Sequence, residues 1–205
     1  MILQIVMDQF SGLLLDLPLS IKTQRLVIRP VMPGDGKEIF AAIEKTRETL
    51  GKWLPWVHKV RSWEDTEKTA REFYAGFILR EKLNFALFHK GHYVGSCGIN
   101  GLNWDVPSAH IGYWCRASAQ GKGFCREGAA ALTLYAFQVL GLKRLTILCD
   151  DRNHKSAAIP EALGYELETR ALGLLANEGA GDLTLSRRYV RFSSKGLEDW
   201  NATWC

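Results

Sequence analysis

The sequence feature that most constrains the fold is a glycine-containing loop, residues 120–126 (QGKGFCR), between a β-prone run and a long helix. The run covers residues 110–115 (HIGYWC), and after the loop apolar side chains recur at helical spacing as far as residue 140. Glycine permits a tight turn into the helix, and the first N–H groups of a helix have no partner within it. A lysine and an arginine add positive charge, so the loop predicts an anion-binding site.

The spacing of this loop excludes two common phosphate-binding loops. A G-x-x-x-x-G-K-[ST] pattern is absent, and G-x-G-x-x-G fails because Arg126 occupies the position of its last glycine. Glycine turns before helices also serve as ordinary caps, so the loop alone leaves its ligand open.

Around the loop, short β-prone runs alternate with amphipathic segments. Capping boxes predict two helix starts, at Asp35 with Glu38 and at Ser62 with Asp65. Helices are expected at 35–50, 62–84, 126–140 and 153–163, and strands at 23–29, 85–88, 93–99, 110–115, 145–149 and 183–190. The order β-α-α-β-β-β-α-β-α-β predicts an α/β (α+β) fold whose middle strands form an antiparallel meander.

The composition is that of one compact globular domain, because 47% of the residues are hydrophobic and no biased tract is present. The net charge of +4 comes without a run of like charge, which argues against a nucleic-acid or membrane partner. The five cysteines lack C-x-x-C or Cys/His spacing, which argues against a zinc site or disulfides and favours a reducing, cytoplasmic location.

The N-terminal segment 1–19 is apolar in patches, but Asp8 and Asp16 interrupt it and no basic region precedes it. A signal peptide or membrane span is therefore not expected. Residues 1–21 are interpreted as an N-terminal extension, 22–192 as the domain and 193–205 as a C-terminal tail.

A second motif follows the expected strand at 145–149. It reads N-H-K-S at 153–156 and I-P-E-A-L-G-Y at 159–165. Further distinctive segments are T-Q-R-L-V-I-R at 23–29, W-L-P-W at 53–56 and I-G-Y-W at 111–114. Together with the glycine loop, these segments resemble the GNAT superfamily of acetyl-CoA-dependent N-acetyltransferases, in its ribosomal-protein (RimJ/RimL-like) branch.

The resemblance extends over about residues 22–190. The loop fits the family pattern Q/R-x-x-G-x-G/A with Gln120, Gly123 and Cys125, the last a small residue where glycine or alanine is usual. The family fold is a mixed, mostly antiparallel sheet, flanked by helices and splayed to admit the cofactor, and this fold is expected here.

The resemblance implies acetyl-CoA as cosubstrate and no metal. The backbone around residues 114–116 would pair with the pantetheine arm, and the Cys115 amide would polarise the thioester carbonyl. The implied cofactor-binding residues are Trp114, Cys115, Arg116, Gln120, Gly121, Lys122, Gly123, Phe124, Cys125, Arg126, Asn153 and Ser156. Acetyl transfer in the family is direct, so the cysteines need not be nucleophiles, and Cys125 and Cys149 are interpreted as packing residues.

Ser156 resembles the family residue that protonates the departing coenzyme A thiolate. Pro160 lacks the N–H that would bond the Ser156 carbonyl, so the helix is expected to kink there. A serine at this place could instead cap the helix or pack. Within the whole constellation the catalytic role is favoured.

An amine must lose its proton before it attacks the thioester, so a general base or a water path is needed. Many relatives carry a glutamate before I-G-Y-W, where this chain has His110. A histidine titrates near neutral pH and could act directly or through water. The alternative is a histidine without a role in the reaction.

Relatives build the acceptor-substrate wall in the connection between the first two helices, which here carries Trp53, Trp56 and Trp63, and large amphipathic rings suit a concave site. These tryptophans could equally cover the hydrophobic core. Three readings stay open: acetylation of a protein N-terminal amine, acetylation of a small-molecule amine, and a non-catalytic acetyl-CoA-binding module. A homodimer is possible by analogy with relatives.

Overall fold

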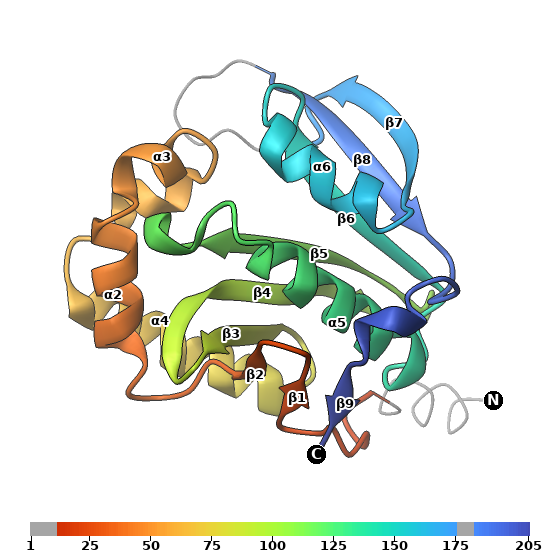
Figure 1. Ribbon diagram of the computed structural model, residues 1–205, viewed down its shortest axis with the longest axis horizontal. Coiled ribbons are helices and arrows are strands. Elements are labelled where there is room, and N and C mark those ends of the chain that lie inside the picture. Colours follow the sequence, from red (N-terminus) through yellow and green to blue (C-terminus); the bar gives the residue numbers. More distant parts are fainter. Residues whose placement is uncertain (1–11, 176–182) are drawn as a thin grey trace, which may run out of the picture.

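The computed structural model describes residues 12–175 and 183–205. Within them the strands form a nine-stranded sheet in the order β7-β8-β6-β5-β4-β3-β2-β1-β9 (Figure 1). The strands are β1 (Ile21–Lys22), β2 (Val27–Pro30), β3 (Leu83–His89), β4 (His92–Asn103), β5 (Ser108–Cys115), β6 (Arg144–Asp150), β7 (Glu166–Leu172), β8 (Leu185–Arg191) and β9 (Thr203–Trp204). The α-helices are α2 (Gly36–Glu44), α3 (Arg47–Gly51), α4 (Trp63–Ile78), α5 (Phe124–Gln138) and α6 (His154–Ala162).

Of the pairings among these strands, only β5 with β6 is parallel. The expected mixed, mostly antiparallel sheet flanked by helices is therefore confirmed. Asp8, with residues 1–11 of the expected N-terminal extension, lies outside the described residues. None of the helices that the structure describes combines the length and apolar character needed to cross a membrane.

The parallel pair β5–β6 separates partway along its length. Residues 108–111 of β5 pair with residues 144–147 of β6, and the pairing stops there. β5 continues along β4 to Cys115, while β6 continues along β8 to Asp150. One edge of β5, at residues 112–115, is thus left without a strand partner in the described part of the chain.

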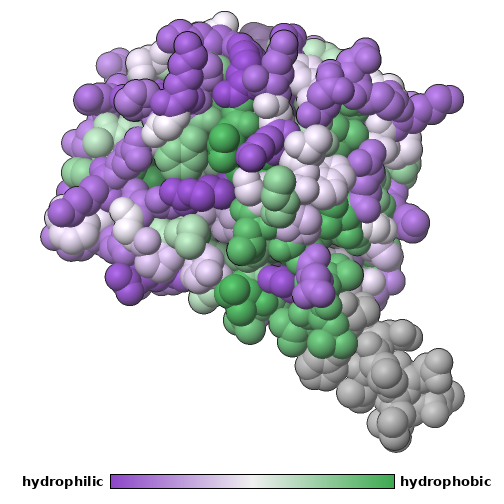
Figure 2. Space-filling model, turned by 60° about the horizontal axis from the view of Figure 1, so that its bottom comes forward, coloured by the Kyte–Doolittle hydropathy of each residue, from purple (hydrophilic) through white to green (hydrophobic). Residues whose placement is uncertain are grey.

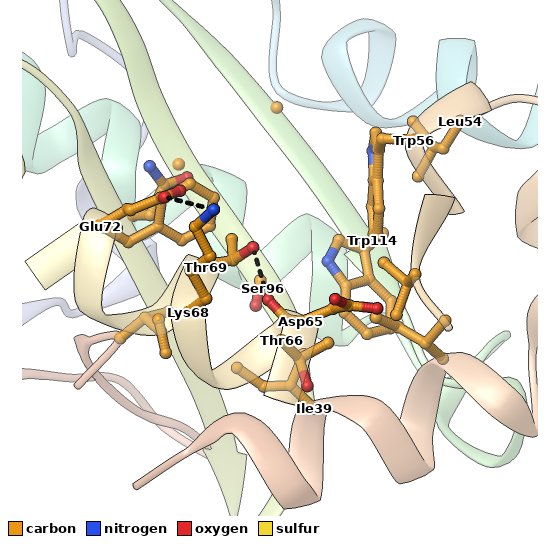
Figure 3. Close-up of a pocket in the computed structure, with 18 of the residues that line it drawn as sticks. Ile39, Leu54, Trp56, Asp65, Thr66, Lys68, Thr69, Glu72, Ser96 and Trp114 are labelled. Atoms are coloured by element: carbon orange, nitrogen blue, oxygen red, sulfur yellow. Dashed lines mark hydrogen bonds and ion pairs between the residues drawn. The ribbon is translucent and has the colours of Figure 1, made fainter. Parts of the chain in front are cut away.

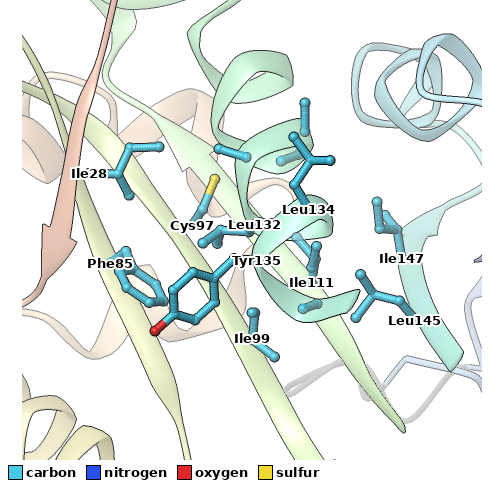
Figure 4. Packing of buried hydrophobic residues seen from close by; sticks show 14 of the residues in the cluster. Ile28, Phe85, Cys97, Ile99, Ile111, Leu132, Leu134, Tyr135, Leu145 and Ile147 are labelled. Carbon is cyan, nitrogen blue, oxygen red and sulfur yellow. The ribbon is translucent and has the colours of Figure 1, made fainter. Parts of the chain in front are cut away.

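Helix α5 packs along one face of the sheet and buries most of its length. Leu132 and Tyr135 of α5 belong to the same buried cluster as Phe85, Ile99 and Ile111 of the strands (Figure 4). The rings of Phe85 and Tyr135 meet edge to face at 5.8 Å. Because each fully buried apolar side chain of this size stabilises the fold by roughly 1.5–3 kcal/mol, the start of α5 is held firmly against the sheet.

Helices α2 and α4 pack against one another and cover the opposite face. Side chains alternate between the two faces of a strand. Along β4, Cys97 and Ile99 belong to the α5 cluster, whereas Ser96 and Asn100 lie on the face toward α2 and α4. The sheet thus separates two environments, called below the α5 face and the α2–α4 face.

The helix expected at 35–50 is two helices, α2 and α3. Between them the Thr46 hydroxyl donates to the Ala42 carbonyl at 2.7 Å and accepts from the Ala117 amide at 2.9 Å. Such side-chain bonds to backbone compete with a continuous helix.

The capping box expected at Asp35 and Glu38 is wrong. Asp35 instead accepts two bonds of 2.7 Å from the Arg29 guanidinium, and Glu38 accepts from the Tyr93 amide at 3.0 Å. The box at Ser62 and Asp65 is confirmed.

Helix α4 ends at Ile78, earlier than expected, and the chain turns at Arg80, whose φ is +59°. Asn84, the expected helix end, therefore lies in β3. The remaining expected helices and strands overlap observed ones.

Strand β7 was not predicted. It joins the sheet through β8, and the Asp151 carboxylate ties the region together by ion pairs with Arg170 at 2.6 Å and Arg187 at 2.7 Å. The short strands β1 and β9 were also missed, and their pairing brings the end of the expected C-terminal tail into the same sheet.

Figure 2 shows a face of the molecule on which polar side chains cover one part and hydrophobic side chains gather toward another edge.

Candidate active site

The loop at 120–126 turns into α5 as its glycines require. Gly121 and Gly123 have φ of +73° and +79°, in the left-handed region that glycine adopts freely. The first bond within the helix runs from the Glu127 amide to the Gly123 carbonyl at 3.0 Å, so the amides of 124–126 precede the helical ladder. A Cβ added at Gly121 would meet nothing within 4 Å. These amides and the helix dipole favour an anion in the open space before the loop.

Arg25, which the sequence did not single out, fixes the loop to the sheet. Its guanidinium donates to the Lys122 carbonyl at 2.9 Å and forms an ion pair with the Glu127 carboxylate at 2.6 Å. Glu127 is buried in α5 and also accepts from the Thr23 hydroxyl at 2.6 Å. Because Glu127 balances its charge, Arg25 positions the loop more than it attracts an anion.

The long side chains predicted to bind the cofactor take different directions. Gln120 donates to the Cys115 carbonyl at 3.4 Å, and Arg116 donates to a β4 carbonyl at 3.1 Å, so both reach back to the protein. The Arg126 guanidinium lies 5.8 Å from the ring centre of Trp200. Arg126 thus stays at the helix start, whereas the side chain of Arg116 points elsewhere.

The amide of Cys115 points toward the unpaired edge of β5. In an antiparallel ladder, opposed residues alternate between hydrogen-bonded and non-bonded pairs. The Arg116 amide donates to the Val94 carbonyl at 3.0 Å, so the neighbouring pair of Gly95 and Cys115 is a non-bonded one. The Cys115 N–H is therefore directed away from β4, to the side where β6 diverges.

Tyr113 connects β5 to α6. Its hydroxyl donates to the Ser156 carbonyl at 2.9 Å, and the Ser156 hydroxyl donates to the Tyr113 oxygen at 3.3 Å. Pro160 removes the helical donor to that carbonyl, and Tyr113 replaces it. Asn153 caps α6, accepting from the Ser156 amide at 3.1 Å. Burial raises the pKa of Tyr113 well above its ordinary value, so its hydroxyl keeps its proton.

Thiols line the same region of the α5 face. A hydrogen bond between Cys115 and Cys125 lowers the pKa of the former and raises that of the latter. Burial raises the pKa of the Cys149 thiol to about 11. The Cys125 and Cys149 thiols therefore stay protonated near neutral pH, in keeping with packing residues.

A cavity of about 550 Å³ lies on the α2–α4 face, between α2, η1 (Pro55–Lys59), α4 and strands β3 to β5 (Figure 3). The rings of Trp56 and Trp114 meet edge to face at 6.2 Å in one wall. The uncharged polar side chains that the strands direct toward the cavity are Asn84, Ser96 and Asn100. The pairing of large rings with a few polar groups is typical of a small-ligand site. Trp53, predicted beside Trp56, is not among the described residues that line this cavity.

His110 shares the α2–α4 face with Gly112 and Trp114 but lies outside the cavity. It lines a second hollow of about 380 Å³, together with Arg144 and Arg188. Partial burial lowers the pKa of His110 below its ordinary 6.5, so the ring is neutral at pH 7. Gly112, two residues along β5, opens onto the first cavity.

The helix-start anion cradle, the split sheet and the cavity on the other face of β5 suit an enzyme that binds a phosphate-bearing cofactor beside a second substrate. Residues 25–166 match the family described as acetyltransferase (GNAT) domain. The chain belongs to this family of acetyl-CoA-dependent acetyltransferases. Among the described residues, no group of three or more His, Cys, Asp or Glu side chains could hold a metal ion.

Three comparisons illustrate the relationship. YdaF of Bacillus subtilis (strain 168), described as a candidate ribosomal N-acetyltransferase, is 30% identical over 165 residues, 78% of this chain and 88% of the relative. RimL, a ribosomal L7/L12 alpha-N-protein acetyltransferase in complex with coenzyme A, superimposes with a TM-score of 0.78 at 22% identity, covering 83% of this chain and 96% of RimL. The microcin C7 self-immunity acetyltransferase MccE, in complex with acetyl-CoA and AMP, gives 0.75 at 21% identity over 82% and 93%.

Proposed function

We propose that this enzyme acetylates the N-terminal α-amine of a protein, by direct attack of the amine on the acetyl thioester. The observation that carries the proposal is that one strand, β5, borders both the split in the sheet, where we place the acetyl donor, and the cavity, where we place the acceptor. The amide of Cys115 faces the split between β5 and β6, while Gly112 and Trp114 of the same strand line the cavity on the α2–α4 face.

The donor side fits acetyl-CoA, which supplies the acetyl group as a thioester. The amides of residues 124–126, with Lys122 and Arg126, suit a pyrophosphate at the start of α5. The unpaired edge of β5 offers backbone donors and acceptors to an extended arm, as a missing strand would. We assign the Cys115 amide to the thioester carbonyl, where a preorganised donor is typically worth roughly 3 kcal/mol.

On the leaving-group side, we assign Ser156 as the proton donor to the thiolate and Tyr113 as the residue that positions it. Their mutual hydrogen bonds and the cap from Asn153 hold the serine against Tyr113 of β5. The two hydroxyls are protonated near neutral pH, as a donor must be.

For the base, we assign His110, acting through water. Of the carboxylates lining the cavity, Asp65 is a poor candidate, because bonds from the Arg61 and Ser62 amides lower its pKa. Neutral His110 can accept a proton at pH 7, and the absent side chain of Gly112 leaves room for water between it and the cavity.

A protein N-terminus is favoured by the names of YdaF and RimL, which both act on ribosomal components according to those names. A small-molecule amine is the second candidate, since MccE, bound to acetyl-CoA and AMP, shares the fold. We place the enzyme in the cytoplasm, where acetyl-CoA is made and the five free cysteines stay reduced.

The test is an acceptor screen with detection of released thiol. Short peptides with free N-termini are compared with the same peptides N-formylated, and with polyamines, aminoglycosides and aminoacyl nucleotides. We expect turnover with free-N-terminal peptides and none with their formylated forms. Turnover confined to the small amines would overturn the proposal in favour of the second candidate.

Gly123→Asp tests the donor site. A side chain at φ +79° is strained, and an added carboxylate would repel a pyrophosphate at the helix start. We expect acetyl-CoA to bind about 10- to 100-fold more weakly by calorimetry, equivalent to roughly 1.4–2.7 kcal/mol. Gly141→Asp, a glycine of similar φ (+67°) after the far end of α5, is the matched control for strain. Equal affinity in the two variants would remove the loop from the donor site.

A further inference from the structure

Two carboxamides converge on the sheet floor of the cavity. Asn84 of β3 pairs in register with Gly98 of β4, which pairs with Gly112 of β5. A Cβ at Gly98 would lie 2.4 Å from the Asn84 Oδ1 and 2.9 Å from the Asn100 Nδ2. Only glycine at this position lets the two asparagines approach each other. Gly112 has nothing within 4 Å of its missing side chain, so the floor beside them is open.

The carboxamides use little of their hydrogen-bonding capacity on each other. The Asn84 amide donates to the Asn100 oxygen at 3.4 Å, the long limit of a hydrogen bond. Each carboxamide carries two N–H donors and an oxygen with two lone pairs. Ser96, their polar neighbour on the floor, is already engaged by the Tyr93 hydroxyl at 2.7 Å. Both residues line the cavity, so the unused donors and acceptors of the pair are available to a ligand there.

The charge of the cavity bears on what these groups bind. Its charged lining residues come from η1 and α4 and are exposed: Lys59, Asp65, Lys68 and Glu72. Asp65 is held by the cap of α4, and Lys68 lies 4.0 Å from Glu72. The floor thus presents neutral amides, which hydrogen-bond an amine or a peptide unit without stabilising an ammonium ion as a carboxylate would. A peptide group, with one N–H and one C=O, is the complement of such a pair.

We propose that the Asn84–Asn100 carboxamide pair binds the first peptide unit of the acceptor and so selects an N-terminal peptide amine over a simple amine. This inference rests on the proposed function and names the residues that give it specificity. The α-amine would then lie over Gly112, close to the Cys115 edge of β5, while the apolar walls of the cavity accept an uncharged first side chain.

The test compares Asn84→Ala and Asn100→Ala on two acceptors. One is a tetrapeptide that begins with alanine; the other is 2-aminobutane, which has the same methyl-bearing carbon but no peptide unit. We expect kcat/KM for the peptide to fall about tenfold in each variant, the effect of a peptide group left unpaired, and that for 2-aminobutane to change less than about threefold. Asn103→Ala, at the end of β4 and outside the cavity, is the matched control.

Asn100→Asp, a variant of the same shape, provides a second test of the pair. The carboxylate keeps the oxygen of the carboxamide but loses its N–H donors, so kcat/KM for the peptide should fall about tenfold while that for 2-aminobutane changes less than about threefold. A residue with a purely structural role would affect the two acceptors alike.

The outcomes separate the two claims. Equal losses on both acceptors, or an unchanged kcat/KM for the peptide in Asn100→Asp while the wild type acetylates peptides, would overturn the role of the pair and leave the proposed function standing. A wild-type enzyme that acetylates 2-aminobutane but no peptide would overturn both. Unchanged acetyl-CoA affinity in each variant checks that the fold is intact.

Discussion

Replacing Ser156 by alanine is expected to lower kcat about a hundredfold, while the affinity for acetyl-CoA changes less than about threefold. The reason is that a proton donor to the leaving thiolate acts in the transition state and contributes little to the ground state. Stopped-flow measurement of thiol release under saturating acetyl-CoA, with calorimetry for the affinity, gives the two quantities. A raised KM for acetyl-CoA with unchanged kcat would remove Ser156 from the reaction.

Tyr113→Phe separates positioning from proton donation. It removes the hydroxyl that donates to the Ser156 carbonyl, the group that Pro160 deprives of its helical donor. We expect a loss in kcat approaching that of Ser156→Ala, and a double variant no worse than the serine variant alone, because the two act as one network. Tyr189→Phe, whose hydroxyl donates to Glu161 on the same helix, is the matched control. Additive losses would show that Tyr113 acts independently of Ser156.

The second large effect is expected for His110→Gln, with a loss of about a hundredfold in kcat at pH 7, the lower end of general-base catalysis. Only the neutral imidazole accepts a proton, so activity falls as the pH drops through the pKa of His110. Since partial burial lowers that pKa, the acidic limb of the wild-type kcat profile should lie below about pH 6.5. The glutamine variant should lack that limb.

The profile is measured at saturating peptide, so that titration of the free amine does not dominate it. His92→Gln, an exposed histidine at the start of β4, is the matched control and should keep the wild-type profile. If His110→Gln retained both the wild-type kcat and the acidic limb of its pH profile, the base would be water or Glu72. His110 would then have no part in the reaction and would only line the second hollow.

The sequence predicted the glycine turn at 120–126 and the helix that follows it, because their signals are local. The glycines of 120–126 need a backbone region that other residues avoid, and the apolar spacing of the next helix can be satisfied only by burial on a sheet. Asn153, Ser156 and Pro160 likewise act within one helix. Each of these features can be read from one continuous stretch of at most about four helical turns of sequence.

The acceptor side was harder, because it is assembled from distant segments. Asn84 was placed at a helix end since nothing local stops the pattern of α4 before it, whereas the turn at Arg80 depends on its bonds to the carbonyls of Leu15 and Phe77. Arg25 and Glu127 are 102 residues apart, so no spacing connects them. Tyr113 was noticed only within a motif, and its role appears only when α6 is packed beside β5.

Strand β7 escaped prediction for a different reason. Most of its side chains are exposed, so it lacks the apolar alternation by which a strand is recognised. It lies at the edge of the sheet and is fixed by pairing with β8 and by the Asp151 ion pairs. The capping box expected at Asp35 failed because Arg29 and Tyr93, from the neighbouring strands, compete for the two carboxylates.

Because donor and acceptor groups come from different elements of the fold, the acceptor specificity of such an enzyme can change separately from its donor chemistry. The groups assigned to the donor come from the edge of β5, the start of α5 and α6, whereas the cavity is built mainly by η1, α4 and the outward side chains of β3 and β4. Among the described residues of β5, Gly112 and Trp114 line the cavity next to the strand edge assigned to the donor. Exchange of the segment between α2 and β3 could therefore redirect the chain to another amine without retuning its acyl chemistry. The acyl-donor site would stay the same while the acceptor site changed.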